Sequence, residues 1–462
     1  MVMKLLIKTA VFVILAMAGA TFARASDLPK TVDDEFKKSE SICRDVESVR
    51  ALKFNARVIT EVQTKADLVK FVRKSVDEQY GKAEAEWYIK ALVKMGLLEK
   101  ELNLSDTMVK ILEGQAAAHY DPETKKCYLL ATDMDAMMLD LVLSHELCHA
   151  LQDQHFNLHD FAQKDIKAIR DNGDASAGKE CLIEGDATFV MMAWMVMKQG
   201  GVTDAATADP MVAMAINMQG AMDYDTVLNM AESNIDQSLG SLTTSIKEMK
   251  DAPRFFMESL YAVYVQGAMM VNFVKTKGGW DAVNALYKNP PQSTEQVLHP
   301  EKLIGKRDVP VDVRMPELKQ KLSGKWSLKE EDVLGELGTK ILFEIWADKE
   351  SRDPVAISAA AAGWGGDRYY YWMNDETGKN LLVWKTVWDS PEDAGEFITS
   401  YRLLLSARFP KMKKAGQSKA GDKFMYQIWE VEPGRFLKLV RSEEMVGVID
   451  STDRSCLDII WK

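Results

Sequence analysis

Apolar residues recur at helical spacing through most of the first 330 residues of the chain. An amphipathic helix places its apolar side chains three and four positions apart, so this spacing predicts a mainly helical region. One apolar, β-branched segment at 57–62 predicts a strand. The helices that the pattern predicts lie near 65–79, 83–98, 105–113, 134–155, 179–199 and 254–276, the last ending at a Gly-Gly pair.

Three segments interrupt this helical pattern. Residues 115–130 hold the turn sequence DPET between two short apolar runs, which predicts a β-hairpin. The stretch 200–250 is rich in Ala, Met, Asp and Ser, and we expect a helical insertion or a lid there. Prolines between 290 and 310 indicate a loop.

From about residue 330 the pattern changes to helices that alternate with aromatic and β-branched strands. The strands are expected at 368–373, 381–388, 423–430, 434–440 and 444–450, and the helices at 334–347, from 353 and at 390–407. The sequence therefore predicts an α+β fold, with a mainly helical domain over 26–330 and a C-terminal α+β domain over 331–462. The aromatic segment 363–372 fits either a binding surface or strand core beside a tight glycine turn.

The first 25 residues have the pattern of an export signal. Lys4 and Lys8 precede an apolar run over 9–23, and Ala23-Arg24-Ala25 offers a small-x-small cleavage site. A membrane anchor is the alternative, but the run is shorter than the roughly 20 apolar residues that a helical span needs. We expect cleavage after Ala25, no membrane span in the mature chain, and a protein exported to the periplasm or the extracellular space.

Composition and charge narrow the function classes. Of the 462 residues 47% are apolar, which excludes a disordered chain, and 58 Lys and Arg against 69 Asp and Glu give a net charge of −11. An acidic chain lacks the basic surface that binds phosphate backbones, so nucleic acid is not an expected partner. The five cysteines are an odd number, and Cys148 and Cys181 fit either a bridge or small core residues.

The sequence His145-Glu146-Leu147-Cys148-His149 lies inside the helix expected at 134–155. Residues four positions apart share one face of a helix, so the two imidazoles can converge on one Zn²⁺ ion. Glu146 is one position on from the first histidine and faces a water bound to that ion. The motif predicts metal-assisted hydrolysis, with two core histidines as the alternative.

A catalytic zinc site has three protein ligands, so one more ligand must come from another segment. The best candidate is Glu184, in the sequence LIEGDA on the next apolar helix. A carboxylate among apolar neighbours is costly unless it is paired or binds a metal. Its alternative role is an acid at the helix N-terminus. Asp186 is expected either to orient a ligand imidazole or to cap the helix.

The HELCH sequence followed by LIEGDA on the next helix resembles the gluzincin metallopeptidases. The blocks HELCHALQDQHF, STEQVLHP and AAAGWGGDRY are also similar to a group of secreted bacterial peptidase-MA-like proteins. The resemblance implies zinc bound by His145, His149 and Glu184, with Glu146 as the general base. It also implies that the hairpin at 115–130 contributes an edge strand that binds peptide substrate.

A gluzincin site usually adds a Tyr or His that donates a hydrogen bond to the developing oxyanion. The resemblance offers three candidates for that role here, in the order His299, Tyr264 and His119. One departure is Asp186, which stands where gluzincin aminopeptidases carry an aromatic residue.

These observations together predict an exported zinc metallopeptidase that acts on a peptide or protein substrate. The first alternative is a non-catalytic envelope protein that uses a zinc site for structure or partner binding. An intact Glu146 argues against it, because a structural site needs ligands but no base. The second alternative is a zymogen, in which part of the chain covers the cleft.

Overall fold

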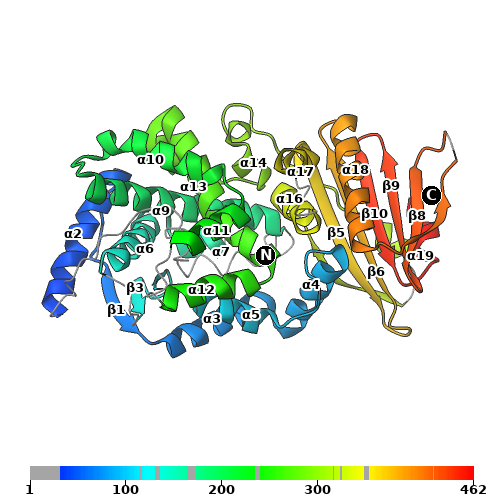
Figure 1. The fold of residues 1–462 in the computed structure, drawn as a ribbon, viewed down its shortest axis with the longest axis horizontal. Helices are drawn as coiled ribbons and strands as arrows, with labels where there is room; N and C mark the ends of the chain where they lie inside the picture. Colours follow the sequence, from blue (N-terminus) through cyan, green and yellow to red (C-terminus); the bar gives the residue numbers. More distant parts are fainter. Residues whose placement is uncertain are drawn as a thin grey trace.

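The computed structural model describes residues 32–113, 117–130, 136–163, 172–234, 240–315, 317–322, 325–347, 353–419 and 421–461. The predicted signal segment 1–25 lies outside these residues. The fold combines a helical part with a separate antiparallel sheet domain that follows it in the chain (Figure 1). Within the described ranges, no helix has both the length and the apolar character needed to cross a membrane.

The helical part agrees with the apolar spacing of the sequence. Its helices are α2 (Val32–Arg50), α3 (Lys65–Tyr80), α4 (Lys82–Met95), α5 (Leu104–Glu113), α6 (Ala136–Phe156), α7 (Leu158–Gln163), α9 (Gly173–Gly200), α10 (Ala205–Gly220), α11 (Tyr224–Asn234), α12 (Gly240–Asp251), α13 (Arg254–Leu286), α14 (Glu295–Leu298) and the 3-10 helix η2 (Pro300–Leu303). The six predicted helices are confirmed, and the described residues of the stretch 200–250 include the helices α10, α11 and α12. The expected loop at 290–310 contains two short helices, because Pro300 begins a turn at its first position instead of breaking one.

A small three-stranded sheet lies beside α6. Its order is β1-β3-β2, where β1 (Ile59–Gln63) runs parallel to β3 (Lys126–Leu130) and β2 (Ala118–Asp121) runs antiparallel to it. β2 and β3 form the hairpin that the turn sequence predicts. β2 is an edge strand of this sheet, all its side chains are buried, and it contacts α6.

The helices α9 and α13 cross with their backbones in contact. A Cβ atom added to Gly185 would lie 2.1 Å from the carbonyl carbon of Gly267, and one added to Gly267 would lie 2.2 Å from the carbonyl oxygen of Cys181. No side chain fits at either position, so the crossing requires both glycines. Farther along, α13 bends at Gly278 and Gly279, where the sequence predicted its end, and then continues as helix.

Seven antiparallel strands form the sheet domain in the order β4-β5-β6-β10-β9-β8-β7. The strands are β4 (Trp326–Asp332), β5 (Trp364–Asn374), β6 (Asn380–Trp388), β7 (Lys413–Gln417), β8 (Met425–Glu432), β9 (Arg435–Ser442) and β10 (Met445–Ser451). The helices are α15 (Glu317–Lys321), α16 (Gly335–Trp346), α17 (Pro354–Ala361), α18 (Pro391–Arg408) and α19 (Cys456–Ile459). The sequence missed β4 and β7, which are the two edge strands. The exposed residues of β7 lack the alternation that marks a strand, and the predicted domain boundary after residue 330 falls inside β4.

Aromatic side chains alternate between the two faces of β5. Tyr369 and Tyr371 belong to the large core shared with the helical part, whereas Tyr370 and Trp372 pack on the opposite face against α15 and α19. Successive side chains of a strand point to opposite faces, so this aromatic run is strand core and not a binding surface. In the glycine-rich segment before it, only Gly363 has a positive φ.

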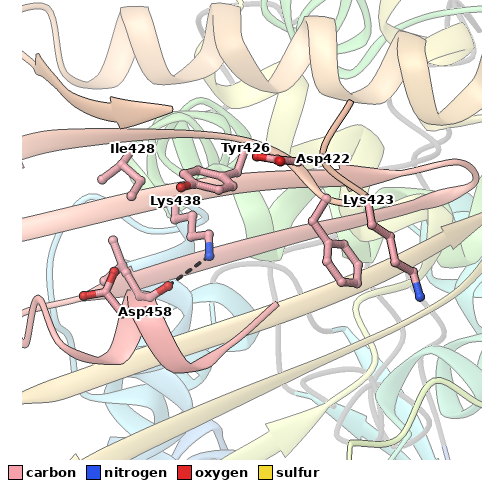
Figure 2. Close-up of a pocket in the computed structure, with 8 residues that line it drawn as sticks. Asp422, Lys423, Tyr426, Ile428, Lys438 and Asp458 are labelled. Atoms are coloured by element: carbon pink, nitrogen blue, oxygen red, sulfur yellow. Dashed lines mark hydrogen bonds between the residues drawn. The ribbon is translucent and has the colours of Figure 1, made fainter. Parts of the chain in front are cut away.

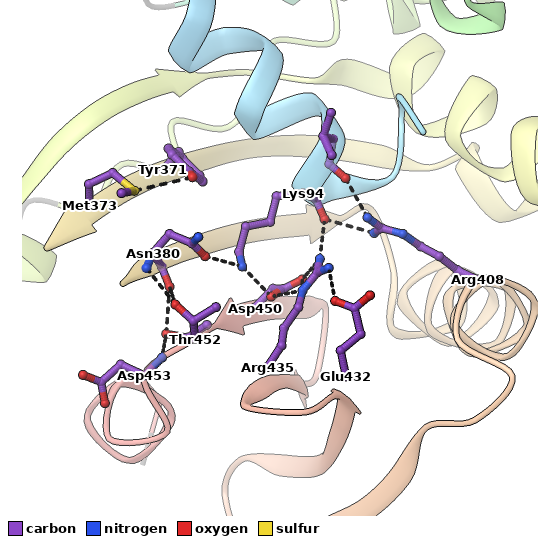
Figure 3. Close-up of polar contacts among 12 residues, drawn as sticks. Lys94, Tyr371, Met373, Asn380, Arg408, Glu432, Arg435, Asp450, Thr452 and Asp453 are labelled. Carbon is purple, nitrogen blue, oxygen red and sulfur yellow. Dashed lines mark hydrogen bonds and ion pairs between the residues drawn. The ribbon is translucent and has the colours of Figure 1, made fainter. Parts of the chain in front are cut away.

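The C-terminal end of α4 docks on the sheet domain through buried charges (Figure 3). Lys94 Nζ lies 2.8 Å from Asp450 Oδ1 and donates to Asn380 Oδ1 at 2.6 Å. Arg435 binds the same aspartate at 2.7 Å, and Arg408 donates to the Lys94 carbonyl oxygen at 3.0 Å. Burial raises the pKa of Asp450, but the charges of Lys94 and Arg435 outweigh it and lower the pKa to about 2. The ionised carboxylate therefore ties α4 to β9 and β10.

We predict that Gly267→Ala lowers the free energy of unfolding by about 1–3 kcal/mol, because the added methyl group meets the backbone of α9. Equilibrium unfolding in urea measures the change. Gly200→Ala is the matched control at the end of α9, where an added Cβ would meet no atom closer than 3.7 Å. A Gly267→Ala variant as stable as the wild type would contradict the requirement for a glycine at the crossing.

Candidate metal centre

The three polar residues of the HExxH sequence lie in the middle of α6. His145, Glu146 and His149 are only 1–3% exposed, because α6 packs against β2, α2 and α9. Cys148 and Cys181 are free thiols in the same core, which confirms the small-core interpretation and not the bridge. Polar groups buried this deeply are stable only when they have partners.

Glu184 of α9 completes the group. His145 Nε2 lies 3.0 Å from Glu184 Oε2, His149 Nε2 lies 3.3 Å from the same oxygen, and the two Nε2 atoms are 3.0 Å apart. Ligands bound at about 2.0–2.1 Å to a tetrahedral zinc ion lie about 3.3 Å from one another. The three atoms therefore form a triangle of the size that a zinc ion requires. A carboxylate oxygen of Glu146 lies within 4.8 Å of both histidines.

Electrostatics within this triangle favour a positive charge at its centre. For His149 the carboxylate of Glu184 outweighs burial and raises the pKa to about 9, whereas burial and the charge of His149 lower the pKa of His145. Burial also acts on Glu184, but the two imidazoles hold its pKa at about 2. His149 thus carries an additional proton and lies beside the ionised carboxylate of Glu184. A divalent ion that binds there displaces this proton.

Gln152 holds His149 in the orientation that metal binding needs. Gln152 Oε1 lies 2.9 Å from His149 Nδ1, and Gln152 Nε2 donates to the carbonyl oxygen of Ile183 at 3.0 Å. The second bond fixes which end of the amide is oxygen, so Nδ1 carries a hydrogen and Nε2 is the nitrogen that a metal would bind once its proton is displaced. The sequence analysis missed Gln152, although its spacing of three from His149 places both on one helical face.

Glu146 is held by the edge of the small sheet. Its Oε2 accepts a hydrogen bond from the backbone N–H of Tyr120 at 2.6 Å. Burial raises the pKa of Glu146 to about 7, against the charge of His149 and this hydrogen bond. The carbonyl of Ala117 bonds to β3, and pairing alternates along a strand, so the backbone groups of Ala118 and Tyr120 point away from β3. This outer edge of β2 therefore lies against the metal centre.

The three candidates for an oxyanion donor lie in different surroundings. The ring centroid of Tyr264, on α13, is 5.9 Å from that of His145. His299 Nε2 lies 2.9 Å from Glu336 Oε1 of α16, in the contact with the sheet domain. His119 is buried in β2 between two aromatic rings. Of the three, Tyr264 is the one whose ring lies beside a predicted zinc ligand.

Both roles expected for Asp186 are wrong, and the helix N-terminal role of Glu184 is wrong as well. α9 begins at Gly173, with Asn172 as its N-cap, so both acids lie in the middle of a longer helix than the sequence predicted. Asp186 pairs with Arg50 instead of an imidazole, with Arg50 Nε at 2.7 Å from Oδ1 and 3.0 Å from Oδ2. No local pattern indicates this partner, because Arg50 is 136 positions away in the chain.

A second acidic group in the described residues has metal-ligand spacing. Glu295, Asp308 and Asp389 bring their carboxylate oxygens within 4.8 Å of one another. Lys302 Nζ lies among them, at 2.6, 3.1 and 3.0 Å respectively. The ammonium group takes the place that a metal ion would need. This group is therefore an ion-pair cluster that ties the segment after α14 to the sheet domain.

A pocket of about 380 Å³ opens on the sheet domain. Its lining includes Asp422, Lys423, Tyr426, Ile428, Lys438 and Asp458 (Figure 2). Burial lowers the pKa of Lys438 to about 8, but its Nζ donates to the carbonyl oxygens of Leu457, Ile460 and Trp461 at 2.9, 3.0 and 3.0 Å. An ammonium group has three N–H donors, so none is left for a ligand. Lys438 therefore fastens the C-terminal segment to β9.

One region of the chain matches a known protein family. A family model described as a domain of unknown function (DUF8575) matches residues 324–460. The match spans the sheet domain from β4 to α19 and does not include the metal centre. No curated protein and no solved structure matches the chain.

We predict that Gln152→Ala weakens zinc binding about 10- to 100-fold, because His149 loses the partner that fixes its tautomer. Competition with a chromophoric chelator measures the affinity. Gln154→Ala, on the same helix, is the control, because Gln154 bonds to the backbone of Asn55 and Ala56 instead of a histidine. Equal zinc affinity in the two variants would contradict the role assigned to Gln152.

Proposed function

We propose that the protein is a zinc-dependent metallopeptidase of the gluzincin type. The observation that carries the proposal is the triangle of ligand atoms from His145, His149 and Glu184, with Glu146 beside it. Metal-assisted hydrolysis needs this combination of three protein ligands and one carboxylate that is not a ligand. A zinc site with a structural role alone usually has a fourth protein ligand instead.

The donor set suits zinc, because imidazole nitrogen and carboxylate oxygen are its usual ligands in hydrolases. When bound, the ion would supply a water of lowered pKa and polarise the carbonyl of the substrate. Glu146 takes the proton of the attacking water and delivers it to the leaving amine. Its Oε2 is held by Tyr120, whereas Oε1 has no hydrogen-bond partner among the described residues, so we assign the proton transfer to Oε1.

The outer edge of β2 supports a peptide as the substrate. An extended peptide can add a strand to a free sheet edge through main-chain hydrogen bonds. The outward groups here belong to Ala118 and Tyr120, although both residues are buried and the N–H of Tyr120 is bonded to Glu146. A peptide paired with this edge is thus placed beside the general base and the zinc ligands. Main-chain pairing does not select side chains, so this edge specifies a peptide without specifying its sequence.

The alternative is a non-catalytic protein that binds zinc for structure or for a partner. The observation that favours it is burial, since the side chains of His145, His149 and Glu184 and of Glu146 are 1–3% exposed. A substrate must reach Glu146, whereas a structural ion needs no access.

The proposed location follows from the sequence alone. Residues 1–25 have the pattern of an export signal, and we propose that the protein acts in the periplasm or outside the cell. The acidic net charge of −11 agrees with a peptide or protein substrate better than with nucleic acid.

We predict that Glu146→Gln leaves zinc binding at about one equivalent but lowers kcat for peptide hydrolysis by about 10²- to 10⁴-fold. The amide keeps the shape of the side chain and cannot accept the proton. Zinc content and the cleavage of a quenched fluorescent peptide library measure the two properties. His145→Ala is the control, which loses zinc and activity together. A wild-type protein that binds zinc and cleaves no member of the library would support the non-catalytic alternative.

We also predict that Tyr264→Phe lowers kcat by about 10²- to 10³-fold without changing zinc affinity, because we propose that the hydroxyl of this residue, whose ring lies 5.9 Å from that of His145, donates to the developing oxyanion. His299→Gln is the comparison, and we expect little effect, because His299 bonds to Glu336. Steady-state kinetics on the same peptide measure both. The reverse result, with loss in His299→Gln only, would assign the donor to His299.

A further inference from the structure

A buried ion pair lies behind Glu184, on the opposite face of α9. Arg50, the last residue of α2, and Asp186 are both fully buried, and Arg50 Nε contacts both carboxylate oxygens. Successive residues of a helix are about 100° apart, so Asp186 points about 200° away from Glu184. Glu184 thus faces the histidines while Asp186 faces α2.

Further side chains join this pair to the other elements of the metal centre. The hydroxyl of Tyr287, at the end of α13, donates to Asp186 Oδ2 at 2.8 Å, and Arg50 Nη2 donates to Asn284 Oδ1 at 2.7 Å. The ring of Tyr287 stacks on that of Phe156, the last residue of α6, with centroids 4.0 Å apart. The cluster therefore connects α2, α9, α13 and α6.

Such a pair is a costly way to stabilise a core. Removing two charges from water takes so much free energy that a well-packed apolar pair of the same volume is often equally stable. An ion pair with fixed geometry differs from apolar packing in one respect, because it weakens when either helix turns or slides. Here the rotation of α9 about its own axis also determines whether Glu184 Oε2 reaches both imidazoles.

We infer that Arg50 is a positioning residue of the metal centre. By holding Asp186 and, through it, the rotation of α9, it keeps Glu184 at 3.0 and 3.3 Å from His145 and His149. The inference rests on the metal site of the proposed function but not on hydrolysis. Arg50 touches neither ligands nor substrate, so its effect appears in metal affinity and ligand geometry.

The test compares two Asp→Asn variants that each weaken a buried ion pair with an arginine. Asp186→Asn acts on the pair with Arg50, and Asp450→Asn acts on the pair with Arg435 in the sheet domain. Zinc affinity is measured by chelator competition, and ligand geometry by the visible absorption of the Co²⁺-substituted protein. We expect zinc affinity to fall 10- to 100-fold and the Co²⁺ spectrum to change in Asp186→Asn. Asp450→Asn should lower stability and leave both unchanged.

Three further variants keep the test decisive if Asp186→Asn does not fold. Tyr287→Phe removes one hydrogen bond to Asp186 and should weaken zinc binding in the same direction by a smaller factor. Arg50→Lys keeps the charge and should retain more zinc affinity than Arg50→Gln. Folded Tyr287→Phe and Arg50→Gln proteins with wild-type zinc affinity and Co²⁺ spectrum would overturn the inference.

The outcomes also separate this inference from the proposed function. If the wild-type protein binds no metal, both are wrong. If it binds zinc, cleaves no peptide and shows the expected loss in Asp186→Asn, the positioning role stands and the proposed peptidase activity does not.

Discussion

The backbone contact between α9 and α13 at Gly185 and Gly267 is the constraint on which the metal centre depends. Gly185 directly follows Glu184, and Gly267 lies about one helical turn after Tyr264. A side chain at this crossing would separate the helices and move Glu184 away from α6. Gly185 does not have a positive φ, so its value lies in the missing Cβ and not in conformational freedom. The glycine of the LIEGDA block is therefore a packing residue that brings the proposed zinc ligand Glu184 close to the two histidines.

Charges on both faces of α9 reinforce this packing. Glu184 on one face is compensated by two imidazoles, and Asp186 on the other by Arg50. Neither carboxylate would be stable in this apolar core without its partner, so each fixes the helix relative to the element that carries the partner. Apolar packing alone tolerates small rotations, whereas two opposed charge pairs do not. A long, largely apolar helix can thus present one carboxylate to a metal in a defined position.

The parts of the structure that the sequence predicted are those that local spacing determines. The two histidines of HELCH share a helical face whatever surrounds them, and the DPET turn predicts its hairpin. The missed parts depend on residues distant in the chain. Arg50 meets Asp186 across 136 positions, and the edge strands β4 and β7 are defined by their neighbours more than by their own residues. Gln152 lay within reach of the helical argument, since its spacing from His149 is local.

The sheet domain also contributes to the position of α9. The first residue of that helix, Gly173, donates its N–H to Asp332 Oδ1 at the end of β4, at 2.5 Å. The next residue, Asp174, accepts from Thr294 Oγ1 at 2.5 Å, and its carboxylate fills the space beside Gly335 of α16, where an added Cβ would lie 1.8 Å from Oδ1. Glu184 follows on the same helix, about 15 Å farther along its axis. The start of the helix that carries Glu184 is therefore held partly by Asp332 and Gly335, which lie in the region that matches a domain of unknown function. These contacts join the sheet domain directly to the helix that carries Glu184.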